Sequence, residues 1–155
     1  MRLAYTTAFT LCLWAAALAA AENPFLGTWK LNPTQSHFSP GPAPKEITVT
    51  FEPDGDKIRR VATGTNADGS PLHETSSIRW DGQDHLVTKP GETPRTVAVT
   101  QVDPRTLQVV VKQDGKVTST IHVVLSADGK TASQTEEGVN DKGEKVHNVV
   151  VAEKQ

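Results

Sequence analysis

Two residues of opposite charge, Arg60 and Glu74, are the strongest candidates for ligand chemistry in this sequence of 155 residues. Each lies in a segment whose side chains alternate between apolar and polar, which is typical of a half-buried strand. Arg60 shares a face with Ile58 and Ala62, and Glu74 shares one with Trp80. In one interpretation Arg60 receives the anionic head of a ligand while Trp80 packs against the ligand's apolar body. In the other, Arg60 and Glu74 pair with each other, because an isolated buried charge is costly.

Other side chains with catalytic or metal-binding potential lack the spacing that such chemistry requires. No ligand spacing relates the histidines, and no cysteine assists them; they are His37, His73, His85, His122 and His147. His122 is expected on an exposed face, and His147 remains as the alternative of a haem ligand on the last strand. The Asp-Gly pairs lack the acidic run of a calcium loop, and no nucleophile-elbow sequence frames a serine. The sequence therefore predicts no catalytic residue, no metal site and no cofactor.

Short strands must position these residues. Asp-Gly pairs, which suit tight hairpin turns, punctuate the chain at residues 54–55, 68–69, 81–82, 114–115 and 128–129. The runs between them are rich in Val, Ile and Thr, and they predict strands near 26–31, 45–52, 56–65, 70–80, 85–89, 95–102, 106–112, 116–125, 130–137 and 144–153. Strands at this spacing favour an all-β fold. We predict an up-and-down antiparallel β-barrel of about 8–10 strands.

The alternation of side chains also predicts a register for three hairpins. A shift by one residue would turn every apolar group to the wrong face, so consistent faces support the pairing. The expected partners are Val49 with Arg60, Ala62 with Glu74, and Val111 with Val117. In this register Glu74 lies diagonally across from Arg60.

The first 21 residues are predicted to be a secretory signal peptide. Arg2 precedes an apolar stretch rich in Leu and Ala, and Ala19-Ala20-Ala21 supplies the small residues of a cleavage site. Residues 22–155 then form one domain, and the loss of Arg2 changes the net charge from −2 to −3. This mild acidity argues against a nucleic-acid partner. The only cysteine, Cys12, leaves with the signal, and no apolar run of the mature chain is long enough to embed it in a membrane.

Residues 33–44 interrupt the pattern of strands. Asn32-Pro33 is expected to cap one short helical turn, and Pro40, Pro42 and Pro44 exclude a longer helix. This stiff connection should lie across one end of the barrel. It is either a lid or a plain surface loop.

A Gly-x-Trp motif opens the mature chain at Gly27-Thr28-Trp29. The stretch Phe25–Leu31 resembles the first strand of lipocalins and intracellular fatty-acid-binding proteins, the calycin group, and the ending Val149–Lys154 resembles their last strand. The whole chain is also similar to small exported bacterial proteins called lipocalin-like. The resemblance implies that Gly27 bends the first strand, that Trp29 plugs one end of the barrel and that Lys154 covers the indole. We expect the first strand to pair with the last near Val150, which closes the sheet.

The chain departs from the fatty-acid-binding proteins in two respects. It lacks their Arg-x-Tyr pair on the last strand, where Val149–Ala152 stands, and its prolines prevent their helical lid. The resemblance therefore implies a shape and the binding of a small hydrophobic or amphipathic ligand, not a particular ligand. We expect an exported, periplasmic, non-catalytic binding protein in which Arg60, Glu74 and Trp80 contact the ligand. The alternative is an envelope structural or protein-interaction module with a filled barrel, and the oligomeric state stays open.

Overall fold

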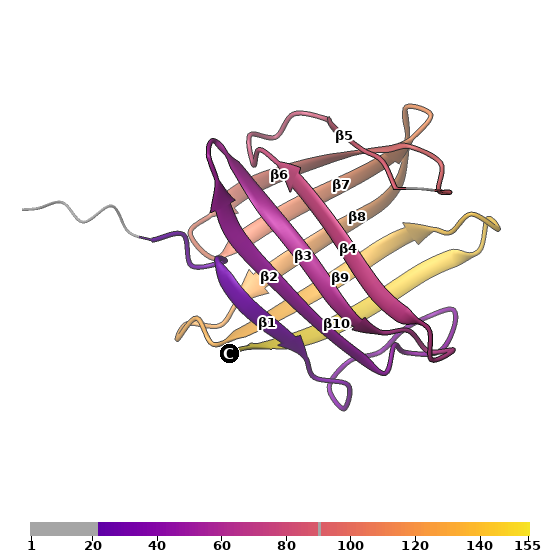
Figure 1. The fold of residues 1–155 in the computed structure, drawn as a ribbon, viewed down its shortest axis with the longest axis horizontal. Helices are drawn as coiled ribbons and strands as arrows, with labels where there is room; N and C mark the ends of the chain where they lie inside the picture. The colour runs from indigo at the N-terminus through magenta and orange to yellow at the C-terminus, as the bar shows by residue number, and fades with distance from the viewer. Residues whose placement is uncertain (1–21, 90) are drawn as a thin grey trace, which may run out of the picture.

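The computed structural model describes residues 22–89 and 91–155. The predicted signal peptide, residues 1–21, lies outside them. The described part contains ten strands and no helix (Figure 1). In chain order they are β1 (Gly27–Leu31), β2 (Glu46–Asp54), β3 (Lys57–Thr65), β4 (Pro71–Ile78), β5 (His85–Val87), β6 (Arg95–Asp103), β7 (Thr106–Gln113), β8 (Lys116–Leu125), β9 (Thr131–Val139) and β10 (Lys145–Lys154). Across the described residues, no helix has the length and apolar character needed to span a membrane.

The strands form one antiparallel sheet in the order β4-β3-β2-β1-β10-β9-β8-β7-β6-β5. β1 and β10, from opposite ends of the chain, lie side by side (Figure 1), and Leu31 is paired with Ala152 and Trp29 with Lys154. This is the expected closing pair. Among the described strands the ladder stops only between β4 and β5, so the molecule is a nearly closed up-and-down barrel. We call this gap between β4 and β5 the seam.

One of the three predicted registers is confirmed, and two are wrong by two residues. Ala62 is paired with Glu74 as expected. Arg60, however, is paired with Phe51 rather than Val49, because the β2–β3 hairpin turns at residues 55–56 and not at 54–55. A shift of two residues preserves the face of each side chain, so Arg60 still points inward.

The β7–β8 hairpin differs for another reason. Its turn is a two-residue loop at Asp114-Gly115, both with positive φ (51° and 74°), which is the preferred hairpin geometry. A bulge then inserts Thr118, so that Val111 is paired with Ser119 and not with Val117. Val117 is left 56% exposed.

The connection between β1 and β2, residues 32–45, runs along β10 and is called the strap here. It begins with a single hydrogen-bonded turn and not with the expected helical turn. The Asn32 side chain caps this turn as expected, because it accepts hydrogen bonds from the backbone N–H groups of Thr34 and Gln35. His37 and Val149 then exchange two backbone hydrogen bonds of 2.7 and 2.8 Å. The strap is therefore fixed to the barrel wall rather than looped freely into solvent.

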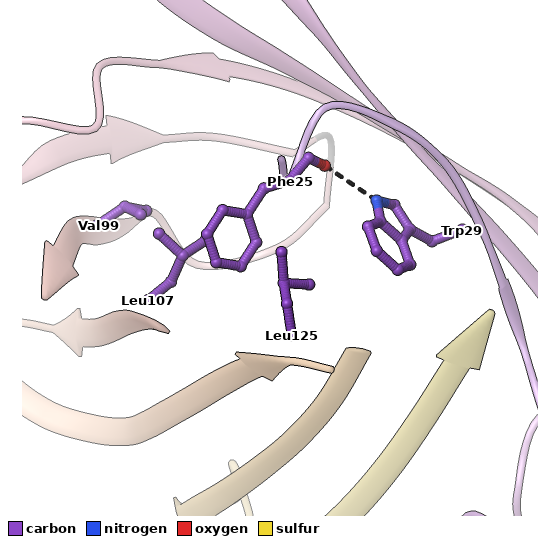
Figure 2. Close-up of a cluster of buried hydrophobic side chains, with 5 residues drawn as sticks. All are labelled: Phe25, Trp29, Val99, Leu107 and Leu125. Atoms are coloured by element: carbon purple, nitrogen blue, oxygen red, sulfur yellow. Dashed lines mark hydrogen bonds between the residues drawn. The ribbon is translucent and has the colours of Figure 1, made fainter. Parts of the chain in front are cut away.

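A buried apolar cluster fills the end of the barrel where β1 begins. It consists of Phe25, Trp29, Val99, Leu107 and Leu125 (Figure 2). The Trp29 indole N–H donates a hydrogen bond of 2.9 Å to the Phe25 carbonyl oxygen, so burial leaves no polar group of the indole unpaired.

The expected cover over Trp29 is also present. Lys154 Nζ lies 5.3 Å from the centroid of the indole ring and donates to the Pro24 carbonyl over 2.9 Å. Gly27, with φ of 110°, supplies the backbone conformation that brings these groups together, and a Cβ there would lie 3.1 Å from Lys154 Cε. The motif thus closes one end of the barrel.

Candidate functional site

The interior holds a cavity of about 450 Å³, which is in the range of small-molecule sites. Its walls are mostly apolar, and every strand contributes to them. Phe38 of the strap also reaches the cavity. The arrangement follows from the alternation of the strands, because every second side chain of a barrel strand points inward.

An aromatic group lines the apolar half of the cavity. Trp80, just after β4, makes edge-to-face contacts with Phe25 and Phe51, with ring centroids 6.1 and 5.7 Å apart. All three rings line the cavity. They form an apolar surface on which a ligand's hydrocarbon body can pack.

Charged side chains cluster at the seam. Arg60 Nη1 on β3 lies 3.2 Å from Glu74 Oε2 on β4, and Lys89 Nζ lies 2.6 Å from Glu74 Oε1. Glu92 pairs with both Lys89 and Arg95. Three cations thus face two carboxylates, and the cluster carries a formal charge of +1. Arg60, Lys89 and Arg95 line the cavity, so this excess positive charge is available to an anionic ligand.

The seam cluster fixes the ionisation state of Glu74. Burial raises the pKa of this carboxyl, but the hydrogen bond and charge of Lys89, followed by the charge and hydrogen bond of Arg60, outweigh it. The pKa of Glu74 is therefore held below its ordinary value of 4.5. At neutral pH the carboxylate is charged, and through Lys89 it joins β4 to the segment that follows β5, a strand with which β4 shares no ladder.

A second polar group lies on β9 and β10. Glu136 accepts hydrogen bonds from Ser119 Oγ (2.7 Å) and Asn148 Nδ2 (3.0 Å). The side-chain oxygen of Asn148, Oδ1, in turn accepts a hydrogen bond of 3.0 Å from the backbone N–H of Ser39 in the strap. Glu136, Asn148 and Gln134 all line the cavity.

The histidine alternative finds no support in this geometry. His147 is more than half exposed and lies 3.7 Å from Glu137 on the outer face of the barrel. His122 is exposed as expected. No group of three or more potential metal ligands occurs within residues 22–89 and 91–155.

No protein-family model matches the sequence, and no curated protein matches it either. Solved structures do match. A fatty-acid-binding protein of Schistosoma mansoni in complex with arachidonic acid has a TM-score of 0.56 at 17% identity, covering 85% of this chain and 96% of that one.

Two further neighbours have the same architecture. The zebrafish ileal bile-acid-binding protein complexed with cholic acid has a TM-score of 0.51 at 9% identity, covering 85% of this chain and 99% of its own. As-p18, an extracellular fatty-acid-binding protein, has a TM-score of 0.53 at 13% identity, with coverages of 86% and 97%. What these proteins share is the fold. At such low identity the likeness extends to the barrel and not to individual residues.

Within this fold the three sequence-predicted residues Arg60, Glu74 and Trp80 line one cavity. Sequence reasoning missed Lys89 and Arg95, although alternation with Val87 and with Val97 places both side chains on the inward face. It also missed Glu136 and Asn148. They could have been found, because they occupy every-second positions with Gln134 and with Val150 and Ala152.

Proposed function

We propose that this chain is an exported, non-catalytic, lipocalin-like protein that binds a small, partly apolar ligand inside its barrel. The observation that carries the proposal is the cavity of about 450 Å³, apolar over most of its wall and positively charged at the seam. Arg60 receives the ligand's anionic group, Glu74 holds Arg60 in place, and Trp80 packs against the hydrocarbon body.

Two fold neighbours also support the binding of a partly apolar ligand, since their structures were solved with arachidonic acid and with cholic acid bound. Each of these molecules joins an apolar body to a carboxylate. The predicted signal peptide supports export to the bacterial periplasm, and one neighbour is described as extracellular. The rival hypothesis, a structural or interaction module, requires a filled interior and is less well supported by a barrel that contains a cavity.

Titration of the mature protein with dodecanoate, followed by calorimetry and by tryptophan fluorescence, tests the proposal. Arg60→Met should weaken dodecanoate binding about tenfold, because a hydrogen bond to a charged group is worth about 1.5 kcal/mol or more. It should leave dodecanol binding unchanged.

Arg59→Met is the matched control. Arg59 is the adjacent residue on the same strand, but it lies on the outer face and pairs with Glu52, so its loss should not affect binding. Native mass spectrometry of protein from its own host would show whether a small molecule co-purifies. Absence of any bound acid, or equal effects of the two arginine variants, would refute the proposed role of the cavity.

A further inference from the structure

The two polar groups of the cavity lie on opposite walls. In the sheet order, β10 and β9 stand in the middle, while β4 and β5 stand at the two ends. Because the sheet curves until its ends approach each other, the middle strands face the seam across the interior. Glu136 on β9 and Asn148 on β10 therefore lie on the opposite side of the cavity from the seam cluster.

Both groups also belong to the same half of the barrel. Glu74 is the fourth residue of β4 and Asn148 the fourth of β10, while Glu136 is the fourth from the end of β9. In an antiparallel barrel β4 and β10 start at the end where β9 stops, so the three residues lie at similar depths from that end. The Trp29 cluster fills the opposite end.

Glu136 differs from every carboxylate at the seam in its partners. None of the ion pairs formed by residues 22–89 and 91–155 includes it. An ionised carboxylate can accept about four hydrogen bonds, and Ser119 and Asn148 supply two. The carboxylate can thus accept further donors from the cavity side. A ligand that supplies such a donor compensates a charge that is otherwise costly in an apolar surrounding.

We propose that Glu136 is a specificity-determining residue that selects amphiphiles carrying a hydroxyl or a protonated amine at a distance from their anionic group. This inference rests on the proposed function, because it assumes that the anionic group binds at the seam. The donor then reaches Glu136 across the cavity. An unsubstituted fatty acid leaves Glu136 to water and gains nothing from it.

The test compares binding of matched acids to the mature protein by calorimetry. The probes are octanoate, decanoate and dodecanoate, each with its ω-hydroxy and ω-amino derivative. The chain lengths vary the separation between the carboxylate and the ω-substituent, so that one of them can match the distance between the seam and Glu136. The best ω-substituted acid should bind about tenfold more tightly than its unsubstituted parent, the value of one hydrogen bond to a charged group. The hydroxyl and amine series distinguish a neutral donor from a charged one.

Variants assign that preference to one side chain. Glu136→Gln keeps an acceptor for Ser119 but removes the charge, and it should abolish the preference for the ω-amino acid, measured as the ratio of its affinity to that of the unsubstituted parent acid. Glu137→Gln is the matched control, because it makes the same change at the next residue, on the outer face and 73% exposed. It should retain the preference in full.

The outcomes separate the two proposals. If the parent acids bind but no substituted acid gains affinity in the unmodified protein, the role of Glu136 is refuted and the proposed function stands. If the preference for the ω-amino acid survives in Glu136→Gln, the role of Glu136 is refuted as well. If no acid of any series binds, the proposed function and the role of Glu136 both fail. The comparison of acids in the unmodified protein needs no variant, so a poorly folded Glu136→Gln does not prevent a decision.

Discussion

Replacement of Glu74 by Gln tests whether ion pairs join the barrel across the seam. In the structure Glu74 contacts Arg60 and Lys89, and the three side chains are 27%, 38% and 26% exposed. Exposed ion pairs contribute about 0–1 kcal/mol, whereas removal of one partner from a buried pair costs about 3–5 kcal/mol. These side chains are intermediate in burial. We therefore expect Glu74→Gln to lower the free energy of unfolding by about 2 kcal/mol at neutral pH.

Urea denaturation followed by tryptophan fluorescence measures this change. Glu52→Gln is the control, because Glu52 pairs with Arg59 on the outer face, with 41% and 49% of the side chains exposed. It should cost no more than about 1 kcal/mol. Adding Arg60→Met to Glu74→Gln should recover part of the loss, because among the described residues Glu74 is the only carboxylate that pairs with Arg60.

The pH dependence provides a second measure. The pKa of Glu74 is lower in the folded protein than its ordinary value of 4.5, so the unfolded chain takes up the proton first as the pH falls. The stability from Glu74 is thus complete above about pH 4.5 and is lost as the pH falls through the folded pKa. The difference between the unmodified protein and Glu74→Gln should shrink over that interval. An equal cost for Glu74→Gln and Glu52→Gln, or a difference that persists at strongly acidic pH, would refute the reasoning.

Three further predictions concern closure of the barrel, strand packing and export. Lys154→Met should lower the free energy of unfolding by about 1 kcal/mol, because it removes the cation above Trp29 and the hydrogen bond to Pro24; urea denaturation beside the exposed control Lys57→Met measures this. Gly138→Ala should cost more than about 2 kcal/mol by thermal unfolding, because its Cβ would lie 2.1 Å from the Thr118 carbonyl oxygen. Gly129→Ala, whose Cβ would meet nothing within 4 Å, should cost only the left-handed penalty of about 1 kcal/mol. Expressed with its first 21 residues in a bacterial host, the exported protein should begin at Ala21 or Glu22 by intact mass.

The fold could be predicted because two local signals agree over most of the strands. Asp-Gly pairs mark the turns, and alternation in the intervening runs gives the inward face of each strand. An error of two residues at the β2–β3 hairpin left Arg60 on the correct face, because the period of a strand is two. The bulge at Thr118 could not be foreseen, since it depends on how β7 and β8 twist against each other.

The site was predicted in part for the same reason. Arg60 and Glu74 belong to regular strands, so their faces and their diagonal contact follow from alternation. Lys89 follows the three-residue strand β5, and Arg95 begins β6 after a turn. Each lies two positions from an inward-facing valine, Val87 or Val97, so alternation places both side chains on the inner face. Only the folded chain shows that Lys89 contacts Glu74 across the seam and that Glu92 pairs with both Lys89 and Arg95.

The position of the charges follows from the one interruption in the sheet. Where β4 and β5 share no ladder, side chains must join the two edges, and edge backbone groups remain accessible to water. Such a place tolerates cations and carboxylates better than a wall that is paired on both sides. The rest of the interior can then stay apolar, interrupted by Gln134, Glu136 and Asn148 opposite the seam. A barrel built this way has a positively charged edge, an aromatic surface and, in Glu136, a carboxylate that forms no ion pair with the other described residues. This combination distinguishes it from a container for hydrocarbon alone.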